Sequence, residues 1–293
     1  MEWGVPRSGV VPRLRSTLPD RARAILPAKP VKVKGSDRRH GIVLAGVFLG
    51  LGLMGASPSQ AEDEFEVGPG AFAVVELFTS EGCSSCPPAD EVLESLVDQA
   101  QRAGLPIYSL SFHVDYWNRL GWTDPFSSPI FSQRQRTYGD RLEGGVYTPQ
   151  AVVNGVEGFV GSDRTTLDRV LRDQLNRARR GDLRAQYERA EDQLVVDFEW
   201  SEFRKRDELF LAIVRSASTV SVPRGENAGR TLTHANVVVG WKAVEMTANQ
   251  GSFGVDLPKD WSPASGEVIC FVQNVGGGEI RGAARVQPRK PSD

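Results

Sequence analysis

The chain has 293 residues, with 35 lysines and arginines against 37 aspartates and glutamates, and three cysteines. Its basic residues gather at the start, because residues 1–40 carry ten of them against three acids. Without residues 1–61 the chain would keep 25 basic and 34 acidic residues, a net charge near −9. Phosphate contacts need clustered lysine and arginine, so this balance argues against a nucleic-acid partner.

The segment after the basic start predicts export. Residues 41–56 are apolar and rich in glycine, but they fall short of the roughly 20 residues that a membrane span needs. This length suits the apolar core of a secretory signal, and Ser59-Gln60-Ala61 supplies a small-x-small cleavage site. We therefore expect a signal peptide that ends near Ala61, a linker over 62–70, and a periplasmic or secreted protein without stable membrane insertion. An uncleaved membrane anchor is the alternative.

The next part of the chain alternates strand and helix patterns. Short apolar runs bounded by glycine or polar residues predict strands, and apolar residues three and four apart predict helices. In chain order we expect a strand at 71–78, a helix at 88–104, a strand at 105–114, a helix at 128–145, a hairpin at 150–161 around Asn154-Gly155, and a helix at 162–181. This β-α-β-α-β-β-α order predicts an α/β domain over 71–181.

After Gly181 the pattern changes to strands alone. Strand-like runs lie at 183–190, 193–200, 208–216, 236–246, 267–275 and 279–286. Several short strands separated by turn-rich pieces predict an all-β, sandwich-like C-terminal unit over 182–286, followed by a tail at 287–293.

Cys83 and Cys86 lie between the first predicted strand and the first predicted helix, in SEGCSSCPPAD. A structural zinc site normally needs four Cys or His ligands, and after residue 61 the chain adds only Cys270, His113 and His234. A Cys-x-x-Cys at the mouth of a helix suits redox chemistry instead, because the helix N-terminus stabilises a thiolate. We expect Cys83, nearer the surface, to attack a partner disulfide and Cys86 to resolve the mixed disulfide.

These motifs carry a family resemblance. VVELFTSEGCSSCPP, followed by the β-α-β-α-β-β-α order, resembles the thioredoxin-like superfamily. More narrowly, FTSEGCSSCPPAD, SFHVDYWNRLGWTDPFSSPIFSQRQRTY, YTPQAVVNG and RGENAGRTLTH together resemble the exported family known as DUF1223. The resemblance implies a thioredoxin-like fold, thiol chemistry, and a cis-proline at Pro149, preceded by Thr148, where substrate backbone would lie. One departure leaves the redox potential open: Ser84-Ser85 separates the cysteines, where thioredoxins usually carry a proline or an aromatic residue.

Glu76 lies in the first predicted strand, on the same side as Val74 and Phe78 if the strand is regular. In thioredoxins an acid on the equivalent strand passes a proton to the resolving cysteine, so the resemblance implies this role for Glu76. A carboxyl group buried in an apolar strand suits proton transfer near neutral pH. The alternative is an edge or bent strand that leaves Glu76 in solvent.

Polar and aromatic residues follow the second predicted strand. His113 and Asp115 come at its carboxyl end, where they could serve the thiolate or a metal, or tie down the following loop. Trp117 and Trp122 belong to an aromatic-rich insertion that forms either a satellite core or a hydrophobic lip for docking polypeptide.

Two features of the second half have their own alternatives. Residues 224–234 are rich in glycine and either reach over the redox site or only join two strands. Cys270 stands among apolar residues in a predicted strand, so we expect an inert buried thiol.

Together these patterns predict an exported thiol–disulfide oxidoreductase. The expected catalytic residues are Cys83, Cys86, Pro149 and Glu76, and the expected substrate contacts are Thr148, Trp117 and Trp122. Its partners would be protein thiols and disulfides of the cell envelope and a redox partner that recycles the pair. No organic cofactor is implied, because the glycine patterns of dinucleotide and phosphate sites do not occur.

Two other functions stay open. One is copper(I) binding through Cys83 and Cys86, with or without His113, since soft thiolates select Cu(I). The other is a purely structural disulfide beside a β unit that serves as an interaction module.

Overall fold

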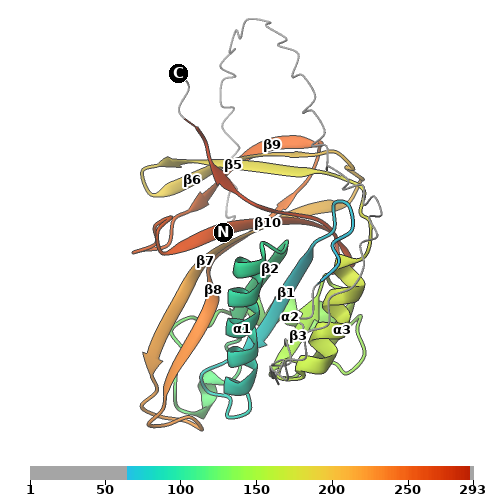
Figure 1. Ribbon diagram of the computed structural model, residues 1–293. Helices are drawn as coiled ribbons and strands as arrows, with labels where there is room; N and C mark the ends of the chain where they lie inside the picture. The colour runs from blue at the N-terminus through green and yellow to red at the C-terminus, as the bar shows by residue number, and fades with distance from the viewer. Residues whose placement is uncertain (1–64, 291–293) are drawn as a thin grey trace, which may run out of the picture. The chain divides into compact units, whose positions relative to one another are not determined.

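The computed structural model describes residues 65–290, which form two β-sheets and three α-helices (Figure 1). The predicted basic segment, signal peptide and cleavage site at Ala61 lie outside the described residues. No helix among residues 65–290 is long and apolar enough to cross a membrane.

The first half of the described chain confirms the predicted order of elements. These are β1 (Ala73–Thr79), α1 (Pro87–Ala103), β2 (Ile107–His113), the short 3-10 helix η1 (Asn118–Leu120), α2 (Pro129–Gly139), β3 (Gln150–Val153), β4 (Glu157–Val160) and α3 (Arg164–Leu175). α1 begins at a proline and ends at Gly104, whose left-handed φ of 63° lets its amide bond the last carbonyls of the helix. α2 ends six residues earlier than predicted, and the chain then turns through Gly144 and Gly145, both at positive φ.

The second half contains strands alone, as predicted. They are β5 (Leu183–Ala190), β6 (Gln193–Trp200), β7 (Asp207–Ser221), β8 (Thr231–Glu245), β9 (Gln250–Asp256), β10 (Gly266–Asn274), β11 (Ile280–Arg285) and β12 (Gln287–Pro288). β9 falls in a glycine-containing stretch that the sequence pattern did not single out.

The pairing of these strands corrects the predicted domain division. The larger sheet has the order β11-β10-β7-β8-β2-β1-β3-β4, so four strands of the second half extend the sheet of the first half. The joint is narrow, because β2 and β8 run parallel and share one register pair, Ser111 with Val237. The other four strands form a separate, smaller sheet in the order β12-β5-β6-β9. The protein therefore consists of a mixed sheet with helices and a second, smaller β-sheet. The predicted boundary at 181/182 does not separate two independent sheets, because strands from both sides of it belong to the larger sheet.

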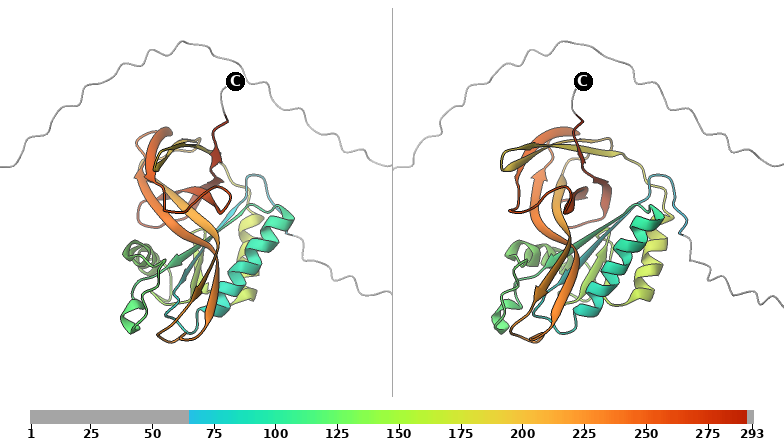
Figure 2. Two further views of the ribbon diagram at one scale, coloured as in Figure 1. Left: turned by 90° about the vertical axis from the view of Figure 1, so that its left-hand side faces the viewer. Right: turned by 60° about the vertical axis from the view of Figure 1, so that its left-hand side comes forward.

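Three apolar cores hold these layers together. α1 and α3 pack on one face of β1 through residues such as Val75 and Leu77, while α2 packs on the other face through Phe131 and Tyr138. Figure 2 shows the helices on the two sides of the sheet. The third core lies between the smaller sheet and the β7–β10 part of the larger sheet, around the fully buried Trp200. This part matches the predicted sandwich.

The β7–β8 hairpin spans both halves of the fold. Each strand has 15 residues, and a register shift at Ile213/Val214 bends the pair on its way along the sheet. One end of the hairpin lies beside the smaller sheet, and its tip lies at the end of the molecule where α1 begins (Figures 1 and 2). We call the tip, residues 222–230, the covering loop.

Candidate redox site

The redox loop, residues 80–86, connects β1 to α1 and carries a disulfide between Cys83 and Cys86, whose Cα atoms are 5.4 Å apart. Two turn bonds shape it: the Cys83 amide donates to the Ser80 carbonyl at 3.1 Å, and the Cys86 amide donates to the Cys83 carbonyl at 3.2 Å. Cys86 is the N-cap residue of α1, and Pro87 occupies the first helical position. The pair therefore lies at a helix N-terminus, where unpaired amides and the helix dipole stabilise a thiolate.

The residues predicted to face Cys83 are brought together with it. The Thr148 hydroxyl donates to Cys83 Sγ at 3.4 Å, and Trp117 Nε1 donates to the same hydroxyl oxygen at 2.8 Å. The Thr148–Pro149 peptide bond is cis, as predicted. Ser85 Oγ lies 3.4 Å from Cys83 Sγ as well. Cys83, Thr148, Pro149 and Trp117 thus form one constellation.

The covering loop lies directly on the redox loop. Asn227 Nδ2 donates to the carbonyls of Glu81 and Cys83, both at 2.9 Å. The Glu226 carboxylate accepts from the amide and the hydroxyl of Ser84, and these bonds lower the pKa of Glu226. Both cysteines are 0% exposed, so the expectation that Cys83 lies nearer the surface is wrong. Of the two interpretations of 224–234, the structure supports the one in which this segment reaches the site.

Trp122 lies close to both the redox loop and the covering loop. Its indole Nε1 donates to Glu81 Oε2 at 2.6 Å, and a Cβ added at Gly225 of the covering loop would lie 3.5 Å from Trp122 Cβ. Trp122 therefore holds a buried carboxylate in place. The expected role of Trp122 as a substrate contact has no support from this geometry.

His113 ties down the loop that follows β2. Its Nδ1 lies 2.7 Å from Asp124 Oδ2, and Asp124 also accepts from the amides of Glu81 and Phe126 at 2.9 Å. Burial alone would raise the pKa of Asp124, but the charge and hydrogen bond of His113 outweigh it and lower that pKa. The geometry favours the interpretation of His113 as a positioned structural residue.

His234 introduces a feature that the sequence did not reveal. Its Nε2 lies 3.6 Å from Glu81 Oε1, and its Nδ1 lies 3.6 Å from Asp90 Oδ2. Both separations exceed hydrogen-bond length, so these contacts are ion pairs. Burial would lower the pKa of His234, but Asp90 and Glu81 raise it to about 9. The His113 ring packs edge to face against it, with centroids 4.6 Å apart. Glu81 and Asp90 lie within SEGCSSCPPAD, and Asn227 and His234 lie within RGENAGRTLTH, but nothing in these two segments showed that the four residues meet.

Glu76 is buried, as predicted, but its surroundings correct the predicted role. Its carboxylate accepts two bonds from Arg134, at 2.5 and 2.9 Å, and one from the Tyr138 hydroxyl at 2.6 Å. Both partners belong to α2, whereas Val75 and Leu77 on either side face α1 and α3. Side chains alternate along a strand, so Glu76 points away from the helix that carries Cys86. Its predicted position behind Cys86 is wrong.

Arg134 itself stands in a ring of aromatic side chains. Its guanidinium carbon lies between 4.8 and 5.9 Å from the centroids of five rings: Phe112, Tyr138, Phe210, Trp241 and Phe271. Its Nη2 also donates to Gln273 Oε1 at 3.3 Å. The ion pair with Glu76 therefore connects β1 and α2 to three strands of the second half.

Cys270, in the middle of β10, is 0% exposed, and burial raises the pKa of its thiol to about 12. Among residues 65–290, no group of three or more His, Cys, Asp or Glu side chains is arranged to hold a metal ion. His113 Nδ1 lies on Asp124, and its Nε2 is buried without a hydrogen-bond partner.

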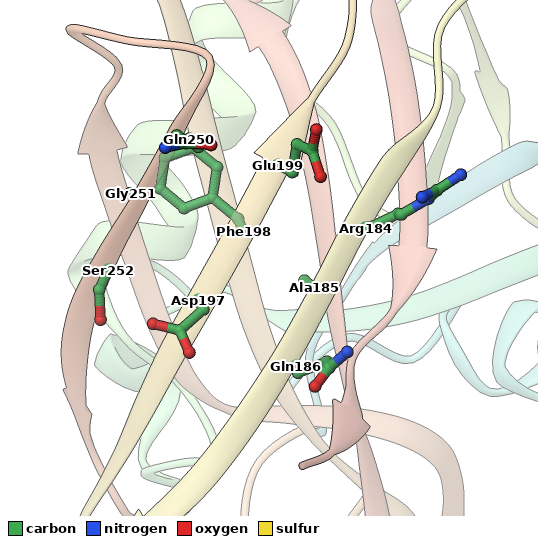
Figure 3. A pocket seen from close by; sticks show the side chains of 9 residues that line it. All are labelled: Arg184, Ala185, Gln186, Asp197, Phe198, Glu199, Gln250, Gly251 and Ser252. Carbon is green, nitrogen blue, oxygen red and sulfur yellow. The ribbon is translucent and has the colours of Figure 1, made fainter. Parts of the chain in front are cut away.

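Two surface hollows are compared as possible substrate sites for the cysteine pair. One, of about 420 Å³, adjoins Cys83 through Thr148 and is lined by Tyr116, Trp117, Arg136, Val146, Tyr147 and Thr148. The other, of about 660 Å³, is lined by side chains of β5, β6 and β9 in the smaller sheet (Figure 3). These strands lie at the end of the molecule opposite the covering loop (Figure 1), so only the first hollow can serve the cysteine pair.

Fold and site together define a mixed α/β protein with a disulfide-bonded Cys-x-x-Cys at the start of a helix. The chain belongs to the family described as protein of unknown function, DUF1223, which matches residues 74–273. The crystal structure of a protein from Agrobacterium tumefaciens is similar, with 30% sequence identity and a TM-score of 0.54 over 76% of this chain and 97% of that chain. A domain of the outer membrane lipoprotein Omp28 from Porphyromonas gingivalis aligns at 10% identity and a TM-score of 0.25, over 38% of this chain and 92% of that one. No curated protein matches the chain.

Proposed function

We propose that this protein is an exported thiol–disulfide oxidoreductase with a thioredoxin-like core, which exchanges disulfides with proteins of the cell envelope. The observation that carries the proposal is the Cys83–Cys86 disulfide at the N-terminus of α1, with the Thr148 hydroxyl on Cys83 Sγ. The observed β-α-β-α-β-β-α order and the cis bond before Pro149 agree with what the thioredoxin-like resemblance implies.

The chemistry assigns different roles to the two cysteines. In the reduced protein, the helix N-terminus and the hydroxyls of Thr148 and Ser85 would stabilise a thiolate on Cys83. This thiolate attacks a substrate disulfide, forms a mixed disulfide, and releases one substrate sulfur as a thiolate. Cys86 then attacks Cys83 Sγ and releases the second substrate thiolate, so the substrate gains two electrons and the cysteine pair is oxidised.

The surroundings of Cys83 favour a polypeptide substrate. The adjoining hollow combines aromatic side chains with the exposed Val146 and the cation of Arg136, a mixture that suits an extended chain better than a small polar molecule. Since Cys83 is fully buried, its surroundings have to move before a substrate sulfur can reach it, and the covering loop, which bonds the Cys83 carbonyl, is one candidate.

Export is supported by the chain's chemistry. A disulfide persists in oxidising compartments such as the periplasm, whereas cytosolic thiols are kept reduced. The predicted signal segment before Ala61 and the acidic balance of the remaining chain agree with a periplasmic or secreted protein.

The test is to trap the reaction halfway. Cys86→Ala leaves no thiol to release the partner, so the exported variant should accumulate reductant-sensitive complexes with envelope proteins through Cys83. Cys83→Ala should give few or none. Cys270→Ala is the matched control, because that thiol is buried in β10 and should leave the trapping by Cys86→Ala unchanged.

The two alternatives predict different results. Copper(I) binding would be lost equally in both cysteine variants, without specific adducts. A structural disulfide would make both variants less stable to the same degree. Equal behaviour of Cys83→Ala and Cys86→Ala would therefore refute the proposed mechanism.

A further inference from the structure

A set of buried charged side chains lies beside the cysteine pair on the face of the sheet that α1 covers. Glu81 belongs to the redox loop, Asp90 to the first turn of α1, and His234 to β8. All three are at most 4% exposed, and His234 lies 3.6 Å from both carboxylates. We call these three residues the acid–histidine cluster.

The cluster has more polar atoms than partners. Glu81 Oε1, Asp90 Oδ1 and both ring nitrogens of His234 are buried without a hydrogen bond, and so is Nε2 of the neighbouring His113. Buried polar atoms are nearly always paired, and leaving one unpaired destabilises the folded state. Several such atoms lie together here, so the cluster has the capacity to bind a further proton.

The charges of the cluster also leave room for a further proton. The raised pKa of His234 makes it a cation at neutral pH, so one positive charge faces two carboxylates. The other groups packed against the cluster are His113, whose Nδ1 lies 2.7 Å from Asp124 Oδ2, and the indole of Trp122, which donates to Glu81. Two buried carboxylates therefore face one cation, and a further proton would balance the charge of the cluster.

Helix geometry connects the cluster to the resolving cysteine. Cys86 has helical dihedral angles, and the Asp90 amide donates to the Cys86 carbonyl at 3.2 Å. Residues four apart in a helix lie on the same face, so the Asp90 carboxylate lies one turn from the Cys86 sulfur. Glu76, the acid expected to serve this cysteine, faces α2 on the other side of the sheet.

We propose that Asp90 accepts the proton that Cys86 loses when it resolves the mixed disulfide, and that His234 and Glu81 are positioning residues that set the proton affinity of Asp90. The inference rests on the oxidoreductase function proposed above. In that step the Cys86 S–H proton passes to the Asp90 carboxylate, and the thiolate forms a bond to Cys83 Sγ. The bond between Cys83 and the substrate sulfur breaks, and the substrate leaves as a thiolate. In the reverse direction the proton returns from Asp90 to Cys86.

An aromatic disulfide whose thiolate absorbs visible light separates the two steps. Mixed in excess with the reduced protein, it releases one coloured thiolate when Cys83 attacks and a second when Cys86 resolves. Asp90→Asn should leave the first phase unchanged and slow the second about 100-fold at pH 7, since a positioned acid or base contributes roughly 10²–10⁴ in rate. Asp98→Asn is the matched control, because Asp98 lies exposed on the same helix, and both phases should stay unchanged.

The pH profile distinguishes proton transfer from mere stabilisation. His234→Gln removes the cation beside Asp90, so the pH profile of the second phase should move up by about one unit. A second phase that Asp90→Asn does not slow, or a profile that His234→Gln does not move, would overturn the inference. Should Asp90→Asn fail to fold, the His234→Gln profile decides. A missing second phase in the unaltered protein would instead refute the oxidoreductase function itself.

Discussion

Replacing Arg134 with methionine tests whether the buried ion pair with Glu76 is structural. Methionine keeps much of the length of the side chain but removes the charge, so Glu76 would stay buried with only the Tyr138 hydroxyl as a partner. Removing one partner of a buried pair costs roughly 3–5 kcal/mol, because the other charge is left uncompensated. The lost attraction between the cation and five aromatic rings adds to this cost. We therefore expect Arg134→Met to lower the free energy of unfolding by about 4 kcal/mol.

Urea unfolding followed by tryptophan fluorescence measures this loss, and the double variant Glu76→Gln/Arg134→Met isolates the pair. The double variant should lose clearly less than the sum of the single losses, because neither change then leaves a buried charge alone. Arg169→Met is the matched control, since Arg169 pairs with Glu157 at an exposed site where a pair contributes about 1 kcal/mol or less. Additive losses, or a loss below 1 kcal/mol for Arg134→Met, would contradict a structural role. The reduction potential of the cysteine pair should stay unchanged in Glu76→Gln, and a large change would restore Glu76 to the redox site.

Three further predictions follow from the site. His234 has a pKa raised from 6.5 to about 9, so the stability it contributes is fully present below pH 6.5 and is lost as the pH rises through 9. The unfolding free energy should fall by about 3 kcal/mol over that range, and His234→Gln should flatten the fall. Asn227→Ala removes two bonds from the covering loop to the redox loop, so a phosphine should reduce the disulfide roughly 5- to 30-fold faster; an unchanged rate would mean that the loop does not limit access. Cys270, with a thiol pKa near 12, should resist alkylation at pH 8 until the protein unfolds, and labelling of the folded protein would contradict its burial.

The sequence predicts the local elements of this protein well, because their signals are local. Apolar spacing and the terminal glycine predicted a helix at 88–104, and the structure has α1 at Pro87–Ala103. The Asn-Gly turn predicted the β3–β4 hairpin in the same way. The sequence pattern also predicted most strands of the second half, but it did not predict which strands pair with one another. Nothing in the composition of β8 shows that it pairs with β2, since that contact depends on residues more than 120 positions apart.

The same distinction applies to the site. The Cys-x-x-Cys pair and the Thr148-Pro149 turn are motifs, and the structure brings them together as expected. The members of the acid–histidine cluster lie in two of the quoted segments, SEGCSSCPPAD and RGENAGRTLTH, but neither segment shows that Glu81, Asp90 and His234 meet in the fold. Glu76 shows the opposite error: the alternation of β1 indicated the correct face, but the resemblance supplied a partner that lies on the other one.

The aromatic surroundings of Arg134 have a consequence for how the chain matures. Glu76 and Arg134 both belong to the first half, but Phe210, Trp241 and Phe271 come much later along the chain. A chain that emerges from its N-terminus, at the ribosome or on the far side of a membrane, has both charges in place long before the rings that enclose them. The first half of the chain therefore cannot shield the Glu76–Arg134 ion pair from water with these rings until Phe271 has been made. The surroundings of this ion pair are therefore complete only when nearly the whole chain is available, although the cysteine pair belongs to the part that emerges first.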